Sequence, residues 1–187
     1  MLDDIKQCVE TLRQGGVILY PTDTIWGLGC DATNSAAVQR IYDIKRRCNA
    51  KSMLVLVDSM ARIEQYVSEV PDIAWDLVEL ADKPLTVVYP QARNLAANLV
   101  ANDGSIGIRV TREAFSRQLC ERFRKPVVST SANMSGEPAP VLFADISQKI
   151  IGQVDFVVKF RQEDTMPAQP SSIVRLGLGG EIEIIRA

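Results

Sequence analysis

Residues 17–24, which read Val-Ile-Leu-Tyr-Pro-Thr-Asp-Thr, join an apolar run to a polar loop and set the interpretation of the rest of the chain. Val17–Tyr20 predicts a short strand, and Pro21 ends it because proline cannot donate a hydrogen bond to a sheet. Three side chains with oxygen atoms follow at once, those of Thr22, Asp23 and Thr24. A loop with clustered oxygens therefore follows a strand.

An amphipathic helix is expected before this strand. Asp3 and Asp4 are positioned to cap it, because short acidic side chains accept hydrogen bonds from the free N–H groups of a first helical turn. Apolar residues then recur at helical spacing towards Gln14, and Gly15-Gly16 closes the helix.

Helices and strands continue to alternate along the chain. Ser35 is expected to cap a helix that runs to about Lys45, and the strand Met53–Val57 follows it. The further predicted strands are Leu85–Tyr89, Ile106–Val110, Val127–Thr130, Val154–Phe160, Ser172–Leu176 and Glu181–Ile185, and the further predicted helices are Ile73–Leu80, Glu113–Arg122 and Ala144–Ile150. Glycine-rich residues 177–180 suit a hairpin, so we expect an α/β protein with a mixed parallel and antiparallel sheet.

Length and composition indicate a single domain. A chain of 187 residues with 47% hydrophobic content can close one core, so one domain over residues 1–187 is expected. The longest apolar runs, such as Met53–Val57 and Leu85–Tyr89, are too short to cross a membrane. The N-terminus lacks the basic flank and apolar stretch of a signal peptide. We therefore expect a cytoplasmic protein without a membrane partner.

The chain contains no histidine, which excludes Ser-His-Asp catalysis, Cys-His catalysis and every histidine-based metal site. Its cysteines are scattered and offer no Cys-x-x-Cys pair for zinc or redox chemistry; they are Cys8, Cys30, Cys48 and Cys120. The net charge is −2 and the pI is near 5.3, so general attraction to a nucleic-acid backbone is absent. Any anion site must therefore be built locally.

Four cations and no acid fall within residues 45–51, between a predicted helix and a predicted strand. Like charges repel one another unless an anion joins them, so the segment suits a clamp for a polyphosphate. A solvated helix end is the alternative, because cations also stabilise a helix C-terminus. The four cations are Lys45, Arg46, Arg47 and Lys51.

A second polar segment, residues 129–136, directly follows an apolar strand. Short side chains such as those of Ser129, Ser131 and Asn133 can point into a crevice at the carboxyl end of the strand, where nucleotides often bind. Ser, Asn and Gly are also the usual residues of an ordinary turn, and spacing alone does not separate the two interpretations.

Two more polar features interrupt or flank apolar strands. Arg109 needs an anionic partner such as a ligand carboxylate if it is buried, although an outward-facing arginine fits the strand alternation equally well. The hydroxyl pair Ser171-Ser172 enters a late strand, and Arg186 is the last residue but one. An arginine so near a chain end is usually exposed, so neither feature alone indicates a function.

Taken in order, three segments resemble the YrdC-like family of threonylcarbamoyl-AMP synthases; they are residues 20–29, 45–47 and 131–136. Shorter matches at residues 84–86, 107–110 and 170–173 extend the resemblance over nearly the whole chain. The resemblance implies a twisted mixed sheet with a concave, positively charged cavity that holds threonine and ATP together. It also implies the short, single-domain form of the family.

The resemblance assigns roles to individual residues. Contacts to threonine or its carbamate are implied for Thr22, Lys51, Arg109, Ser129 and Ser171. Contacts to ATP are implied for Lys45, Arg47, Ser131, Asn133 and Arg186. Lys45 and Arg47 would be catalytic by neutralising charge at phosphorus. The metal ligands stay open, because a residue such as Asp23 in a polar loop is more often a cap or turn former.

The implied reaction joins L-threonine, bicarbonate or carbon dioxide, and ATP into threonylcarbamoyl-AMP and pyrophosphate. The protein would be a nucleotidyltransferase that serves threonylcarbamoyladenosine modification of tRNA. The reaction needs no protein nucleophile, so the missing histidine is no obstacle. Mg²⁺ is expected with ATP, and no organic cofactor is expected. The expected partners are the three substrates, RNA in the form of tRNA or double-stranded RNA, and a downstream tRNA threonylcarbamoyl transferase.

Three departures from the family pattern favour a second hypothesis. Cys48 and Ser52 replace two prolines of a stiff loop, residues 81–83 read Ala-Asp-Lys where the family has Trp-Pro-Gly, and Leu56 stands where some members have histidine. The alternative is a paralogue that binds nucleotide or double-stranded RNA without efficient synthesis. The two differ in their response to threonine, which an RNA-binding protein would ignore.

Overall fold

The computed structural model describes residues 1–46 and 53–187, and this part of the chain forms one sheet with helices packed against it. The described strands are β1 (Ile18–Tyr20), β2 (Gly27–Gly29), β3 (Leu54–Val57), β4 (Leu85–Tyr89), β5 (Ile106–Val110), β6 (Val127–Ser131), β7 (Phe156–Val157), β8 (Ser172–Leu176) and β9 (Ile182–Arg186). The helices are α1 (Leu2–Arg13), α2 (Ser35–Lys45), α3 (Met60–Ile63), α4 (Ile73–Leu80), α5 (Ala114–Phe123), α6 (Gln148–Ile151) and the 3₁₀ helix η1 (Phe143–Asp145).

The strands lie in the order β7-β1-β2-β6-β3-β5-β4-β8-β9. The pairs β1–β7, β3–β5 and β4–β8 are parallel, and the other neighbouring pairs are antiparallel. The predicted α/β class with a mixed sheet is therefore confirmed. The predicted hairpin between β8 and β9 is confirmed as well, and Gly180 supplies a positive φ of 89° in its turn.

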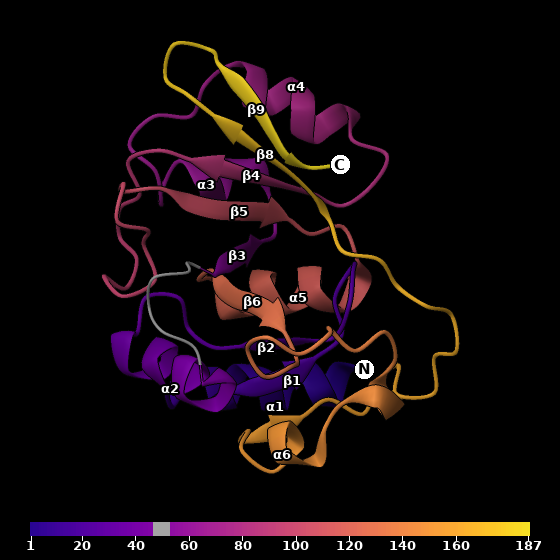
Figure 1. Cartoon of the computed structure of the whole chain (residues 1–187). Coiled ribbons are helices and arrows are strands. Elements are labelled where there is room, and N and C mark those ends of the chain that lie inside the picture. Colours follow the sequence, from indigo (N-terminus) through magenta and orange to yellow (C-terminus); the bar gives the residue numbers. More distant parts are fainter. Residues whose placement is uncertain (47–52) are drawn as a thin grey trace.

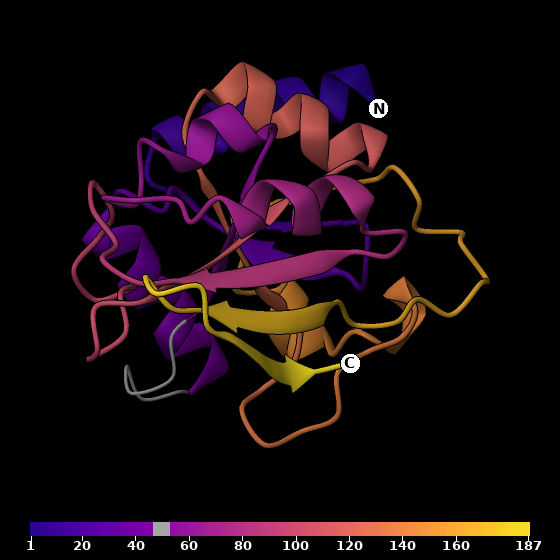
Figure 2. The ribbon, with the colours of Figure 1, turned by 90° about the horizontal axis from the view of Figure 1, so that it is seen from above.

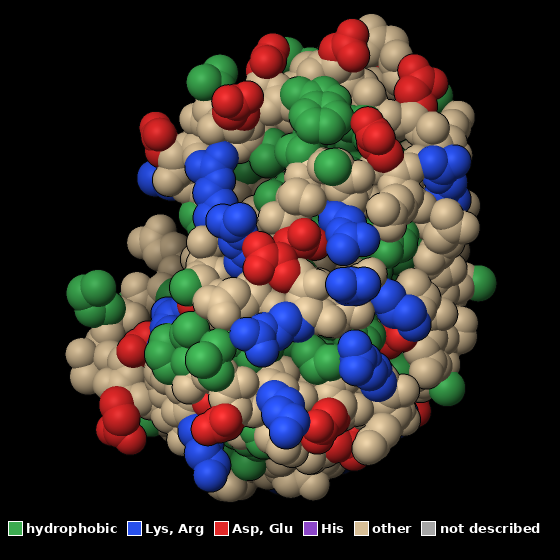
Figure 3. Space-filling view, turned by 180° about the vertical axis from the view of Figure 1, so that it is seen from behind, with side chains coloured by type: hydrophobic (Ala, Val, Ile, Leu, Met, Phe, Trp, Pro, Cys, Tyr) green, Lys and Arg blue, Asp and Glu red, His purple; other side chains and the backbone are tan. Residues whose placement is uncertain are grey.

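Helices α1, α3, α4 and α5 cover one face of the sheet, while the opposite face of β3, β5, β4 and β8 stays open (Figure 1 and Figure 2). Strand alternation explains the division, because Ile106 and Ile108 of β5 point into the core under the helices. Gly107 and Arg109 of the same strand then belong to the open face. Seen from the helical side, the surface carries interspersed acidic and basic side chains (Figure 3).

Among the helices of residues 1–46 and 53–187, none combines the length and apolar character that a membrane crossing requires.

The predicted cap of α1 is wrong. Met1 occupies the N-cap position, and no side chain caps the helix, so neither Asp3 nor Asp4 has the expected role. Asp4 is buried and accepts hydrogen bonds from the backbone N–H groups of Lys159 at 3.4 Å and Phe160 at 3.1 Å. The carboxylate therefore ties α1 to the chain that follows β7, a long-range contact that local sequence does not contain.

The predicted cap of α2 is displaced by one residue. Asn34, not Ser35, is the N-cap, and its Oδ1 accepts hydrogen bonds from the backbone N–H groups of Ala36 at 3.0 Å and Ala37 at 3.2 Å. Both residue types cap helices well, so the sequence offered two adjacent candidates.

Two predicted elements are shorter in the structure. The expected strand Val154–Phe160 is reduced to Phe156–Val157, because its partner β1 is itself only 3 residues long. The expected helix Ala144–Ile150 is divided into η1 and α6. Ser147 accepts a hydrogen bond from the N–H group of Lys149 and starts α6 afresh.

Strand β2 and helix α3 were not predicted. Two glycines in a strand of 3 residues hide β2, since glycine is rare in strands. A Cβ atom on Gly29 would lie 2.6 Å from the ring of Tyr20 and 3.0 Å from the carbonyl oxygen of Val128. The close approach of β1 and β6 therefore requires glycine at this position.

Replacing the capping residue of α2 tests its placement. Asn34→Ala should lower the free energy of unfolding by about 1 kcal/mol, because two N–H groups of the first turn lose their acceptor. Ser35→Ala is the matched control and should change it by less than about 0.5 kcal/mol, as expected of a surface site. Urea denaturation measures both variants, and a larger loss for Ser35→Ala than for Asn34→Ala would contradict the assigned cap.

Candidate active site

A crevice of about 310 Å³ opens on the uncovered face of the sheet. Five of the residues predicted from the sequence line it together: Arg109, Ser129, Ser131, Ser171 and Arg186. They come from β5, β6, the start of β8 and β9, which are far apart along the chain. The strand order brings them to one place, because β6 and β8 flank the β3-β5-β4 centre of the sheet.

Other residues of the wall had been given no site role from the sequence. Thr24, Trp26 and Thr130 line the crevice, and Met53, Leu54 and Ile173 supply apolar surface. The signal that could have found Thr24 is its place in the same polar loop as Thr22, which was chosen instead. The apolar residues could not have been assigned to a site from the sequence, because apolar side chains in strands usually belong to the core.

The hydroxyl of Thr22 is used inside the loop. Its Oγ1 donates to the carbonyl oxygen of Ile25 at 2.8 Å and lies 3.0 Å from Oγ1 of Thr24. Thr22 itself lines a neighbouring hollow and not the crevice. Through these contacts Thr22 stabilises the loop that presents Thr24 to the crevice.

A buried ion pair lies at the base of the crevice. Nη2 of Arg109 is 3.1 Å from Oδ1 of Asp23, and the two side chains are 3% and 10% exposed. The same Nη2 donates to Oγ1 of Thr24 at 3.3 Å, while Nε of Arg109 has no hydrogen-bond acceptor among the described residues. The guanidinium therefore keeps one buried donor available.

Burial opposes charge on both members of the pair. It raises the pKa of Asp23, and the nearby Arg109 guanidinium partly offsets that effect. It also lowers the pKa of Arg109, which the carboxylate of Asp23 counteracts. Each charge therefore depends on the other, and an additional anion near Arg109 would favour its charged state.

Lys45 is buried behind the wall of the crevice. Its Nζ donates to the carbonyl oxygens of Ser131 and Asn133, the latter at 2.7 Å, and lies 3.4 Å from Oδ1 of Asn133. Oγ of Ser131 also donates to Oδ1 of Asn133. The ammonium group thus holds the polar segment that follows β6, and Asn133 supports Ser131 from outside the crevice lining.

Arg186 and Ser171 form the opposite wall. Nε of Arg186 donates to the carbonyl oxygen of Ser171 at 2.8 Å, although Arg186 belongs to an exposed edge strand. Oγ of Ser171 lies 2.9 Å from Oγ1 of the buried Thr86. The described lining contains two arginines and no acidic side chain. The predicted site residues Arg47 and Lys51 lie outside the described residues, as do Cys48 and Ser52.

Two sequence departures can be placed. Leu56, at the position where some relatives have histidine, is fully buried in β3. Residues 81–83 line a second hollow of about 140 Å³, which also reaches Asp23 and Arg112. The segment that replaces Trp-Pro-Gly therefore shares a hollow with Asp23, the acidic member of the ion pair.

Fold and site together define an α/β protein with a small-ligand crevice on the open face of a mixed sheet. The Sua5/YciO/YrdC family model, described as "Telomere recombination", matches residues 10–187. The threonylcarbamoyl-AMP synthase of Pseudoalteromonas translucida is 35% identical over 157 residues, which are 82% of this chain and 84% of that protein. The chain belongs to the Sua5/YciO/YrdC family.

Solved structures of the family share the fold. Sua5 of P. abyssi complexed with L-threonine has a TM-score of 0.82 and 23% sequence identity over 92% of this chain, which spans only 50% of the Sua5 chain. YciO of E. coli has a TM-score of 0.84 and 23% identity, covering 100% of this chain and 89% of its own. The likeness to YciO therefore extends over most of both chains.

The coupling of Asp23 to Arg109 can be measured as stability. Asp23→Asn should lower the free energy of unfolding by about 3–5 kcal/mol, because it leaves a buried guanidinium without a counter-ion. In an Arg109→Met background the same Asp23→Asn change should be neutral or stabilising, since it then removes an unpaired buried carboxylate. Urea denaturation of the four proteins gives both values, and an equal cost in the two backgrounds would show that the charges are not coupled.

Proposed function

We propose that this protein is an L-threonylcarbamoyladenylate synthase, a nucleotidyltransferase that forms threonylcarbamoyl-AMP and pyrophosphate from L-threonine, bicarbonate and ATP. The observation that carries the proposal is the meeting of Arg109, Ser129, Ser131, Ser171 and Arg186 in one crevice. The name of the Pseudoalteromonas translucida relative supports it, as does the L-threonine in the P. abyssi Sua5 complex. The product would serve tRNA modification through a downstream transferase.

Threonine would bind at the Arg109 end of the crevice. Its α-carboxylate can accept a hydrogen bond from the buried Nε of Arg109, which lacks an acceptor among the described residues. The hydroxyls of Ser129 and Ser171 line the same space and can pair with the hydroxyl of threonine. Valine would leave those buried groups unpaired, so it should be rejected more strongly than serine.

The reaction needs positioned charges and no protein nucleophile. The threonine nitrogen bonds to the carbon of bicarbonate, and one bicarbonate oxygen leaves with protons as water to give a carbamate. A carbamate oxygen then bonds to the α-phosphorus of ATP, and the bond from that phosphorus to the leaving oxygen breaks to release pyrophosphate. Such a step is accelerated by alignment of the two anions and by neutralisation of the charge that develops.

Cations and hydroxyls from both walls of the crevice would hold the nucleotide. Arg186 and Ser131 face the crevice, and Lys45 fixes the segment that contains Ser131 and Asn133. Lys45 would therefore act on ATP from behind the wall, by orienting this segment and adding positive charge. Direct contact of Arg47 with the phosphates and of Lys51 with the threonine carbamate stays a prediction from sequence.

We propose that Mg²⁺ enters with ATP, held by phosphate oxygens. The described residues contain no group of three or more Cys, Asp or Glu side chains that could hold a metal ion. The described residues therefore fit a magnesium–nucleotide substrate better than a resident ion. When bound, the ion would neutralise phosphate charge. An RNA contact likewise stays a prediction from sequence.

Threonine-dependent pyrophosphate release tests the proposed function. Purified protein with ATP, bicarbonate and Mg²⁺ should release pyrophosphate and form the adenylate only when L-threonine is present. L-serine should support less turnover than L-threonine, and L-valine the least, because valine cannot pair with the hydroxyl groups of the crevice. A folded protein without threonine-dependent turnover would favour the paralogue that binds nucleotide or RNA.

Adjacent serines provide a matched pair for the threonine site. Ser171→Ala should raise the KM for threonine about tenfold, equivalent to about 1.4 kcal/mol, because a buried hydrogen-bonding group is lost. Ser172→Ala should leave KM unchanged, since Ser172 is outside the crevice lining. Steady-state kinetics at saturating ATP measure both values. Equal effects of the two substitutions, or a change confined to the KM for ATP, would remove Ser171 from the threonine site.

A further inference from the structure

Arg161 contacts three separate parts of the chain. Its Nη1 donates to the carbonyl oxygen of Thr22 at 3.0 Å and lies 3.5 Å from Oε1 of Glu113, the N-cap residue of α5. Its Nε donates to Oδ2 of Asp164 at 2.6 Å. The guanidinium is therefore fixed between the loop that follows β1, the start of α5 and its own segment.

The backbone at Arg161 adopts a conformation that arginine rarely takes. Its φ is 69°, in the left-handed region that favours glycine, so an arginine here costs free energy. The preceding residue is anchored independently, because Phe160 stacks on Phe115 with ring centroids 5.9 Å apart and its N–H group donates to Asp4 at 3.1 Å. The contacts of the Arg161 side chain therefore offset the cost of its own backbone, and one of them is made to the loop at Thr22.

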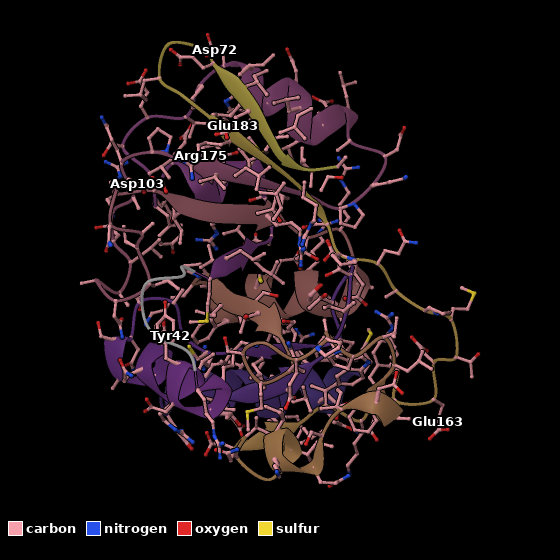
Figure 4. All side chains as sticks on the ribbon, in the orientation of Figure 1. Tyr42, Asp72, Asp103, Glu163, Arg175 and Glu183 are labelled. Carbon is pink, nitrogen blue, oxygen red and sulfur yellow. The ribbon has the colours of Figure 1, made fainter. Side chains whose placement is uncertain are left out.

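The segment that begins at Arg161 leads to the crevice. Residues 161–171 run along the outside of the molecule and return to β8 (Figure 1), with the exposed Glu163 at the outer edge (Figure 4). Ser171, at the end of this segment, and Thr24, in the loop that follows β1, both line the crevice. Arg161 therefore connects two parts of the chain that each supply the crevice with a hydroxyl group.

We propose that Arg161 is a positioning residue of the threonine site, which fixes the loop between β1 and β2 so that Asp23 stays paired with Arg109. The assignment rests on the proposed function and adds a residue outside the crevice lining. Asp23 holds Nη2 of Arg109 and thereby orients the guanidinium, whose Nε has no acceptor among the described residues. Arg161 acts on this pair through the loop backbone and through its own positive charge.

The charge of Asp23 depends on groups from several elements. Burial raises its pKa most and Arg109 lowers it, while Glu113 raises it and Arg161 lowers it to a smaller extent. Removal of the Arg161 charge should therefore raise the pKa of Asp23 further, whereas removal of the Glu113 charge should lower it. Neither change alters the other titratable groups near Asp23, which are Tyr20, Asp82, Lys83, Arg112 and Cys120.

Two variants that each remove one charge should shift threonine binding in opposite directions along the pH axis. As the pH falls, Arg161→Gln should lose affinity for L-threonine at a higher pH than the wild type, because Asp23 is protonated earlier and releases Arg109. Glu113→Gln should keep its affinity to a lower pH, and its amide oxygen can still cap α5. Calorimetric titrations with L-threonine across the acid pH range measure both shifts. A purely structural role would weaken binding equally at every pH.

Steady-state kinetics separate positioning from folding. At neutral pH, Arg161→Gln should raise the KM for L-threonine about fivefold and leave kcat and the KM for ATP within about twofold of the wild type, because only threonine binding is affected. Arg161→Lys keeps the positive charge and should restore part of the loss. Arg161→Gly removes the side chain together with the unfavourable φ, so it should unfold near the wild-type temperature and still show the full increase in KM.

Exposed charges supply the matched controls. Arg117→Gln removes an arginine that pairs with Glu121 on the surface of α5, and Glu163→Gln removes an acid from the Arg161 segment. Both should bind threonine like the wild type at every pH. Shifts of Arg161→Gln and Glu113→Gln in the same direction, or an unchanged KM in folded Arg161→Gln, would overturn the assignment alone. A wild-type protein that binds no threonine would contradict the proposed function and the assignment with it.

Discussion

The buried pair of Arg109 and Asp23 is the interaction on which the site depends. Arg109 belongs to β5 near the centre of the sheet, whereas Asp23 belongs to the loop between β1 and β2 on the other side of β6 and β3. A charge buried alone would be strongly unfavourable, so each residue requires the other to stay in place. The loop is held from behind as well, because Arg161 donates to the carbonyl oxygen of Thr22 at 3.0 Å and lies 3.5 Å from Glu113.

This arrangement explains how a chain without histidine can serve acyl-phosphate chemistry. The proposed reaction requires that two anions be brought together and that a third charge be stabilised at phosphorus, and none of these tasks needs a base. The chain supplies buried positive charge in two ways. Arg109 is presented directly to the crevice, while Lys45 acts through the segment of Ser131 and Asn133. A negative overall charge is compatible with such a site, since the positive groups are local.

Much of the fold could be predicted from sequence because apolar alternation reports burial directly. Strands β4, β5 and β8 and helix α4 have their expected bounds. The sequence predictions fail where long-range contacts override the local preference of a residue for a cap, turn or strand. Asp4 has the sequence features of a cap but is drawn to the backbone at Phe160, and Gly29 looks like a turn residue but lies in a strand because Tyr20 approaches it closely.

Part of the site could also be predicted, from resemblance to a family and not from apolar alternation. Arg109, Ser129 and Ser171 were identified by resemblance, and the sheet order then places them together. The charge pairing of Arg109 with Asp23 was invisible, since the two residues are far apart in sequence and only the fold brings them to 3.1 Å.

The role of Arg109 in binding threonine is tested most directly by calorimetric titrations of the wild-type protein. They compare L-threonine with L-threoninol, which lacks the carboxylate. If Arg109 anchors the α-carboxylate, L-threonine binds and L-threoninol binds at least about a hundredfold more weakly, as expected for loss of a charge-assisted contact with a buried guanidinium. Similar affinities for the two compounds would contradict the account, because the carboxylate would then not lie at Arg109.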